Sequence, residues 1–305
     1  MKIAVIGSYG VGLSMRVPRM PEAGETLSGG AFEAGPGGKG SNQAIGAARL
    51  GADVRFLTAI GADDYGRGAR ELWANEGVDA SRVVEFTDAP TMAGFIMVEP
   101  SGENRIAIAP GALDRFSEGD VETFREEIAQ SDVLLVSMEI PMPAVIAALR
   151  IGRDVGVTTI LNPAPAQHLP DAALENADII TPNQTEARVI LGATDATLSD
   201  EDVAKAISDL VDGVVVMTRG AEGAIVVEDG ALHEVAAVRA PRVVDTTGAG
   251  DAFNAALAVR VAEGHPLVAA AAFAARAGAH AVTKDGVVPA LPTRRDLNLM
   301  DGESL

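Results

Sequence analysis

The sequence predicts an α/β protein: a central, mostly parallel β-sheet flanked by helices, with a second, smaller β-sheet. Short β-branched runs alternate along the chain with amphipathic or alanine-rich segments, which is the order that a parallel sheet covered by helices requires. Two stretches, about 13–34 and 91–108, break this alternation with strand-like pieces that have no helix between them. Because no repeat, low-complexity tract or linker interrupts the 305 residues, we expect a single domain over 1–305.

The central sheet is predicted from short runs that are rich in valine, isoleucine and leucine. These runs are Lys2–Ile6, Val54–Ala59, Val133–Ser137, Thr158–Leu161, Ile179–Thr181 and Val214–Thr218. Helices are predicted between and after them. They are Ser41–Leu50, Tyr65–Asn75, Pro143–Asp154, Gln184–Leu191, Glu201–Val211, Asp251–Glu263 and Leu267–Ala281.

The small sheet is predicted from Thr26–Phe32, Ala93–Val98 and Arg105–Ile108. A sheet that is inserted at two points of a larger α/β core is well placed to cover a site, so we predict a lid formed by about 13–34 and 91–108. The alternative is an edge extension of the main sheet.

Composition excludes several classes of function. Apolar residues make up 48% of the chain and charged residues 22%, as in a globular protein. The formal net charge of −19 disfavours nucleic-acid binding and membrane-surface binding, because an acidic surface repels phosphate groups. The chain has no cysteine, which excludes disulfides, thiolate metal sites and a cysteine nucleophile, and its 4 scattered histidines lack zinc-ligand spacing.

The apolar stretches at the two ends of the chain are short. The first run stops at Gly7 and is too short for a signal peptide, and the stretch 267–275 is about half of what a membrane span needs. We therefore expect a cytoplasmic protein.

Gly7, Gly10 and Gly12 follow the first predicted strand, as the glycines of a dinucleotide-binding turn do. Their spacing is G-x-x-G-x-G, whereas the fingerprint is G-x-G-x-x-G followed by a helix, which Pro18 and Pro21 oppose here. An NAD-dependent oxidoreductase is therefore a weak alternative.

A second glycine-rich segment, 35–43, opens a predicted helix. It lacks the spacing of a P-loop, because Glu33 stands at the place of the first glycine and Gly40 follows the lysine. Glycines still let backbone amides approach a ligand, and Lys39 and Asn42 offer donors to hydroxyl groups. The plainer alternative is a helix entry with a solvated lysine.

The sharpest signal is the segment 244–254, in which Gly248, Ala249 and Gly250 lead into a helix. Backbone amides at such a helix start form an anion hole that suits a phosphate. Asp251 follows in the first turn, where a carboxylate can simply favour the helix dipole. It is also where a general base must lie if a hydroxyl is to attack that phosphate.

Three further segments follow predicted strands, at the edge of the sheet where ligands bind in α/β proteins. Asn183 and Glu186 can form a capping box, or can lie near magnesium and its waters. The turn 218–223 can hold a nucleotide or only reverse the chain. Glu139 lies just after the predicted strand that ends at Ser137.

Together these segments resemble the PfkB family of carbohydrate kinases. The resemblance covers nearly the whole chain, with the segments in the order Gly24–Thr26, Gly37–Gln43, Leu161–Ala166, Thr181–Glu186 and Asp245–Asp251. It implies a ribokinase-like fold, in which a central, mostly parallel sheet flanked by helices carries a small β-sheet lid. It also implies ATP-dependent phosphoryl transfer to the primary hydroxyl of a sugar, and a homodimer formed through the lid.

The resemblance also implies roles for individual residues. Asp251 corresponds to the catalytic base, and the amides of Gly248, Ala249 and Gly250 correspond to the anion hole. The sugar-contact positions, besides Asp251, are Gly10, Gly12, Gly38, Lys39, Asn42 and Glu139. The nucleotide positions are Asn183, Thr218, Gly220, Gly223, Gly250 and Ala275. The implied cofactors are ATP, Mg²⁺ near Asn183 and Glu186, and K⁺ near Asp245, Thr247, Ala281, Lys284, Gly286 and Ala290.

The chain departs from the ribokinase-like pattern at ligand positions. Gly10 and Gly12 stand where the pattern has Asn and Asp, the pair that holds the secondary hydroxyls of the sugar. Their loss leaves the hydroxyls of ribose unpaired or leaves space for a different substrate, so a kinase of another sugar or of a nucleoside is the main alternative. Ala290 replaces a serine near the cation loop, and Ala275 replaces a polar residue near the adenine. A non-catalytic sugar sensor is disfavoured, because a sensor does not need a base.

Overall fold

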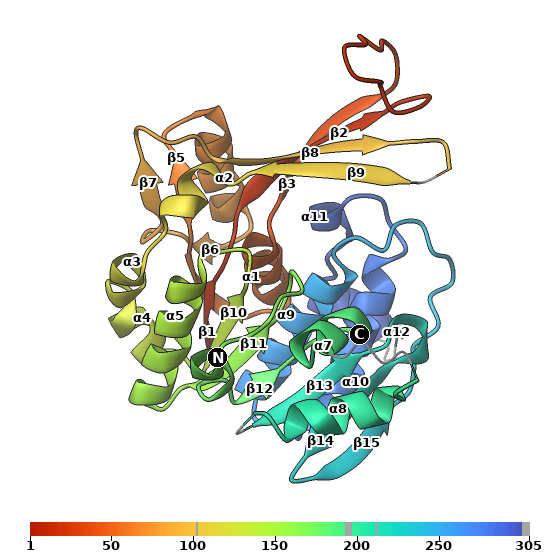
Figure 1. The fold of residues 1–305 in the computed structure, drawn as a ribbon. Helices are drawn as coiled ribbons and strands as arrows, with labels where there is room; N and C mark the ends of the chain where they lie inside the picture. Colours follow the sequence, from red (N-terminus) through yellow and green to blue (C-terminus); the bar gives the residue numbers. More distant parts are fainter. Residues whose placement is uncertain (102, 193–196, 212, 301–305) are drawn as a thin grey trace.

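The computed structural model describes residues 1–101, 103–192, 197–211 and 213–300; residue 102 of the predicted lid lies outside them. Within these ranges, a large sheet of nine strands has the order β15-β14-β13-β12-β11-β10-β1-β4-β6 (Figure 1). Its strands are β1 (Lys2–Ile6), β4 (Asp53–Leu57), β6 (Val78–Asp79), β10 (Val133–Ser137), β11 (Thr158–Asn162), β12 (Ile179–Ile180), β13 (Val214–Thr218), β14 (Ala224–Glu228) and β15 (Ala231–Val235). Strands β13 to β6 run parallel and β14 and β15 are antiparallel, so the predicted, mostly parallel sheet is confirmed.

Successive side chains of the strands point to opposite faces of the sheet and build two hydrophobic cores. In β1, Ile3 and Val5 face one core, and Ala4 and Ile6 face the other. The first core is covered by α1 (Lys39–Arg49), α2 (Asp64–Asn75), α9 (Ala249–Ala262), α10 (Leu267–Ala281), α11 (Val287–Ala290) and α12 (Arg294–Met300). The second is covered by α3 (Glu118–Glu122), α4 (Arg125–Ala129), α5 (Met142–Val155), α6 (Asp171–Leu174), α7 (Gln184–Ile190) and α8 (Asp200–Ser208). Among the described helices, none has the length and apolar character needed to cross a membrane.

A separate small sheet has the strand order β3-β2-β8-β9. Its strands are β2 (Gly10–Arg16), β3 (Phe32–Gly37), β8 (Met92–Val98) and β9 (Asn104–Ala109). Figure 1 shows it projecting from one end of the molecule, above the large sheet. It begins just beyond the carboxyl end of β1, and β3 leads into α1 with only Gly38 between them. The predicted second sheet is therefore confirmed, and it is not an edge extension of the large sheet.

Two local predictions were wrong, and one weak alternative lost its support. Gly10 and Gly12 lie in β2 and no helix follows them, as Pro18 and Pro21 indicated, which removes the structural basis of the dinucleotide-binding alternative. Thr26–Phe32 is not a strand, because Gly29 and Gly30 have φ of +111° and +104°, which lies outside the strand region. Val54–Ala59 divides between β4 and β5 (Ala59–Gly61), and β5 pairs with β7 (Val84–Phe86) in a separate two-stranded sheet.

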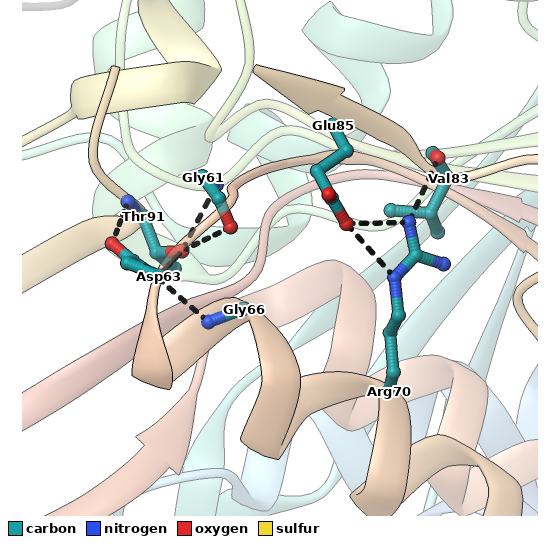
Figure 2. A network of polar contacts seen from close by, with 7 residues as sticks. All are labelled: Gly61, Asp63, Gly66, Arg70, Val83, Glu85 and Thr91. Atoms are coloured by element: carbon teal, nitrogen blue, oxygen red, sulfur yellow. Dashed lines mark hydrogen bonds and ion pairs between the residues drawn. The ribbon is translucent and has the colours of Figure 1, made fainter. Parts of the chain in front are cut away.

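Asp63 links the start of α2 to the chain segment that enters the small sheet. It is the N-cap of α2, and its Oδ1 accepts hydrogen bonds from Gly66 N at 2.8 Å and Thr91 Oγ1 at 2.7 Å (Figure 2). Its Oδ2 accepts a third from Thr91 N at 2.8 Å, and Thr91 Oγ1 accepts one from Gly61 N at 3.0 Å. Because Thr91 directly precedes β8, one carboxylate links α2 to the chain that enters the small sheet.

We expect Asp63→Ala to lower the free energy of unfolding by about 2–3 kcal/mol at pH 7, because hydrogen bonds to a charged acceptor are lost. Burial raises the pKa of Asp63, but its hydrogen bonds with Thr91 and Gly66 together lower the pKa by a larger amount. The net pKa is therefore below its ordinary value. The stabilisation is therefore present above the unfolded-state pKa of about 3.9 and is lost as pH falls through the folded-state pKa. Urea denaturation at several pH values measures both effects.

The control is the exposed ion pair in the same view, in which Arg70 Nη2 lies 3.1 Å from Glu85 Oε2 (Figure 2). Glu85→Ala should cost less than about 1 kcal/mol, because exposed ion pairs contribute little. Equal losses for the two variants would contradict the role given to Asp63.

Candidate active site

Three of the predicted sugar-site residues, Lys39, Asn42 and Glu139, lie near Asp251, in the first turn of α9. The side chain is buried, with 6% of the residue exposed. Asn42 Nδ2 donates a hydrogen bond to Oδ2 of Asp251 at 2.8 Å, and Gln43 Nε2 donates one to Oδ1 at 3.2 Å. Since Asn42 and Gln43 belong to α1, the packing of α1 against α9 fixes the direction of the carboxylate.

The start of α1 brings Lys39 and Glu139 to the same place. The backbone N–H of Lys39 donates to Oε2 of Glu139 at 2.9 Å, and Ser8 Oγ donates to the same oxygen. Gly38, the residue before the helix, has φ +93°, and a Cβ there would lie 2.7 Å from Tyr9 Cα. Only glycine therefore lets α1 begin so close to the end of β1.

The electrostatics of this cluster suit proton transfer. Burial is the largest influence on the pKa of Asp251 and raises it; Lys39, Asn42 and Gln43 oppose the rise, and Glu139 adds to it. The net result is a raised pKa, and a carboxylate with a raised pKa is a stronger proton acceptor. Burial lowers the pKa of Lys39, but the neighbouring carboxylates raise it by more, so the lysine stays a cation beside Asp251.

A buried polar chain continues from the carboxylate to the start of α9. Gln43 Nε2 also donates to Asn162 Oδ1 at 3.0 Å, and Asn162 Nδ2 donates to the carbonyl of Thr181 at 3.4 Å. Thr181 Oγ1 donates to Asn254 Oδ1 at 2.6 Å, and Asn254 Nδ2 donates to the carbonyl of Gly250 at 2.9 Å. Sequence analysis gave no role to these four side chains. The sequence did hold one signal for them: they are polar residues at the ends of strands or within helices whose neighbouring residues are mostly apolar.

The six predicted nucleotide residues line one cavity of about 830 Å³, within the range of about 300–1,000 Å³ for small-molecule sites. They are Asn183, Thr218, Gly220, Gly223, Gly250 and Ala275. A β-bridge between Asn183 and Thr218 joins the start of α7 to the end of β13. Because Gly250 directly precedes Asp251, the cavity adjoins the carboxylate cluster.

The predicted anion hole lies where the cavity meets α9. Gly248 is the N-cap, with φ +80°, and no side chain caps the helix. The amide of Ala249 donates to the carbonyl of Thr246 at 3.3 Å, so this predicted donor has an internal partner. The amides of Gly250 and Asp251 lie in the first turn, where no helical carbonyl is available to them. This end of the cavity can therefore receive an anion.

The predicted magnesium residues form a capping box at α7. Glu186 N donates to Asn183 Oδ1 and Asn183 N donates to Glu186 Oε2, both at 2.8 Å. Burial raises the pKa of Glu186 and is the largest influence on it. Across the described ranges, no group of three or more His, Cys, Asp and Glu side chains could hold a metal ion. A cation at this end of the cavity would therefore need ligands from phosphate and water as well.

The predicted potassium positions lie on two neighbouring loops, at the last residue of α10 (Ala281) and on α11. Asp245 Oδ1 accepts hydrogen bonds from the backbone N of Thr247 at 2.9 Å and from its Oγ1 at 2.7 Å. The backbone N of Val244 donates to the carbonyl of Val282 at 2.7 Å, which places the first loop beside the segment 281–286. Ala290 is buried in α11.

A family model described as pfkB family carbohydrate kinase matches residues 1–294. The chain belongs to the pfkB family of carbohydrate kinases. The ribokinase of Haemophilus influenzae is 38% identical over 297 residues, which are 96% of each protein. The deoxyribokinase of Salmonella typhimurium is 32% identical over 303 residues, 98% of each. A solved structure of Arabidopsis thaliana ribokinase, complexed with ribose and ATP, is similar with a TM-score of 0.91, at 29% identity and 99% coverage of both chains. The predicted family, ribokinase-like fold and reaction class are confirmed.

We expect Gln43→Leu to lower kcat of this pfkB-family kinase by about tenfold, because the carboxylate of Asp251 loses one of its two donors. The loss also raises the pKa of Asp251 further. If Asp251 acts as a general base, it must be deprotonated, so the acidic limb of the kcat/KM profile should move to higher pH. A merely structural role would lower the free energy of unfolding and leave this limb in place. The exposed Gln130 supplies the control Gln130→Leu, which should change neither quantity.

Proposed function

We propose that this kinase transfers the γ-phosphoryl group of ATP to the primary hydroxyl of a sugar, with Asp251 as the general base. The observation that carries the proposal is the position of Asp251. Its carboxylate is buried, is held by two side-chain donors, and directly follows the helix start that opens onto the cavity of about 830 Å³.

The reaction follows from this arrangement. The hydroxymethyl oxygen of the sugar lies between Asp251 and the γ-phosphorus; it gives its proton to the carboxylate as its bond to phosphorus forms. The bond from phosphorus to the bridging oxygen breaks, and ADP leaves with that electron pair. Because phosphoryl transfer depends mainly on positioning and charge stabilisation, the backbone amides of Gly250 and Asp251 and the Lys39 cation would stabilise the developing charge.

Two cations belong to the proposal. Asn183 and Glu186 offer oxygen atoms near the phosphate end of the cavity and would hold Mg²⁺ through water, where it would neutralise phosphate charge. Asp245 and Thr247, with the backbone of Ala281, Lys284, Gly286 and Ala290, would hold K⁺ next to the anion hole. Turnover measured in K⁺ against Na⁺, and with and without Mg²⁺, tests both assignments.

The small sheet is proposed as the lid, which would close over the sugar, exclude water and limit ATP hydrolysis. It carries exposed apolar side chains, among them Phe32 at 63%, Phe95 at 53% and Ile108 at 60%. A homodimer that covers these side chains is proposed, in a cytoplasmic enzyme. Sedimentation of the wild type and of Phe95→Glu measures the mass; a monomeric wild type would contradict the dimer.

The deciding experiment is acceptor-dependent ADP release from ATP over a panel of pentoses, hexoses, ketoses and nucleosides. Turnover with one or more sugars is expected, and Asp251→Asn should lower it by about 10²- to 10⁴-fold. Absence of acceptor-dependent ADP release over the whole panel would overturn the proposed function. Turnover with nucleosides alone would favour the alternative that Gly10 and Gly12 raise.

A further inference from the structure

We infer that the acceptor sugar meets the small sheet through an edge without free hydroxyl groups, either because the edge is deoxygenated or because its hydroxyls are substituted. The inference rests on the proposed function and defines its substrate class. It follows from which side chains the small sheet presents to the site, which the next paragraphs establish.

Alternation along the chain shows which face of the small sheet looks at the acceptor site. Tyr9 and Val11 pack into the hydrophobic core, whereas Ser8, between them and β1, donates its hydroxyl hydrogen bond to Glu139. Successive side chains of an extended chain point to opposite sides. Gly10 and Gly12 therefore lie on the side of Ser8 and Glu139, which is the side of the acceptor site.

On that face, five neighbouring positions of the small sheet are glycine, and the side chains beside them are apolar: Met92, Ile96 and Ile108. Gly10 pairs with Gly37 of β3, and Gly12 pairs with Gly35 of β3 and with Gly94 of β8. Residues directly opposite in neighbouring strands share a face, so five glycines form one patch on the acceptor side. A Cβ added at Gly35 or Gly94 would have nothing within 4 Å, and one at Gly12 would meet its nearest neighbour at 3.8 Å. The patch is therefore open space.

At Gly10, the space for a side chain is already taken by an apolar group, the side chain of Met92. Met92 stands opposite Gly10, and a Cβ on Gly10 would lie 2.4 Å from Met92 Cε and 2.9 Å from its carbonyl oxygen. Met92 thus occupies the space that a side chain at position 10 would need. Sequence analysis missed this replacement, because the two residues are far apart in the chain.

A sugar hydroxyl that points at this patch finds no side chain to pair with. The backbone groups of β2 are engaged in pairing with β3 and β8, and the next polar side chains on this face, Ser14 and Glu33, lie about 7 Å further along the sheet. An apolar pocket discriminates against an added hydroxyl by at most about 100-fold, so ribose remains a poor substrate and is not excluded.

The test is a comparison of kcat/KM values with Mg²⁺ and saturating ATP. The acceptors are D-ribose, its 2-deoxy and 3-deoxy derivatives, and its 2-O-methyl and 3-O-methyl ethers, which separate a deoxygenated edge from a substituted one. For the wild type we expect at least one derivative to exceed ribose by about 10- to 100-fold. Ribose equal to or better than all four derivatives would overturn the inference.

Two variants at one open position separate hydrogen bonding from size. Gly12→Asp supplies an acceptor for the sugar hydroxyl and should shift the ratio toward ribose by about tenfold or more, whereas Gly12→Ala adds bulk alone and should not. Equal shifts in both variants would also overturn the inference. If no acceptor of the wider panel of pentoses, hexoses, ketoses and nucleosides is phosphorylated, the proposed function fails; if ribose is phosphorylated at least as well as its four derivatives, only the present inference fails.

Discussion

Asp251→Asn should lower kcat by about 10²- to 10⁴-fold and at the same time raise the thermal stability of the protein. The amide keeps the shape of the side chain and can still accept a hydrogen bond from Asn42, but it cannot take the proton of the acceptor hydroxyl. Steady-state ADP release with the best acceptor of the panel measures the loss. Near-full turnover by a folded variant would remove Asp251 from its role.

The gain in stability follows from the raised pKa of Asp251, whose largest cause is burial. In the unfolded chain the carboxyl group ionises at its ordinary pKa, below that of the folded state. The folded state therefore loses stability as pH rises from the unfolded-state pKa through the folded-state pKa, and at neutral pH the buried charge is destabilising. The Asp251→Asn variant carries no charge at this position. Its Tm should therefore exceed that of the wild type at pH 7, and the two Tm values should become similar near pH 3.

The control for both measurements is Asp64→Asn. Asp64 also stands in the first turn of a helix, α2, but its side chain is 91% exposed. This variant should keep the wild-type kcat and change Tm little, because an exposed carboxylate pays no desolvation cost.

Gly248→Ala should lower kcat by about 100-fold or more, since the anion hole depends on the backbone of this turn. The residue has φ +80°, which disfavours any L side chain, and an added Cβ would lie 2.4 Å from Val287 Cγ1. To accept it, the turn must shift, and a displacement of about 1 Å at reacting groups costs about 100-fold in rate. Adding Val287→Ala should restore part of the activity, because it removes the nearest atom.

Gly264→Ala separates this effect from backbone strain. Gly264 has a similar φ of +77°, follows the other end of α9, and has nothing within 4 Å of an added Cβ. It should lose about 1 kcal/mol of stability and keep its kcat. Equal kinetic losses at the two glycines would show that strain, and not the anion hole, explains the effect at Gly248.

Most of the site could be predicted because its residues occupy places that the fold itself defines. Lys39, Glu139, Thr218 and Asp251 each stand at the start of a helix or at the end of a strand, and strand ends of a parallel sheet meet at one edge. Local sequence signals therefore sufficed to place them together.

The features that were missed need contacts between distant segments or a closer reading of turns. Gln43 reaches Asp251 across 208 positions, and no local pattern marks that contact. The hairpin β14–β15 did carry a local signal, the pair Asp229-Gly230 with φ of +50° and +73°, a sequence typical of a tight hairpin turn. That Gly10 and Gly12 lie in a strand was not predicted; glycine is uncommon in strands, although a strand that must leave room beneath it can use it.

Only Gly38 separates β3 from α1, so a single residue joins the small sheet to the helix whose Asn42 and Gln43 hold the carboxylate of Asp251. If the small sheet closes over the sugar as proposed, its movement would be passed directly to the start of α1. Enclosure of the acceptor alcohol and orientation of the carboxylate would then be coupled, and a water molecule, which is too small to contact the sheet and the carboxylate together, would trigger neither.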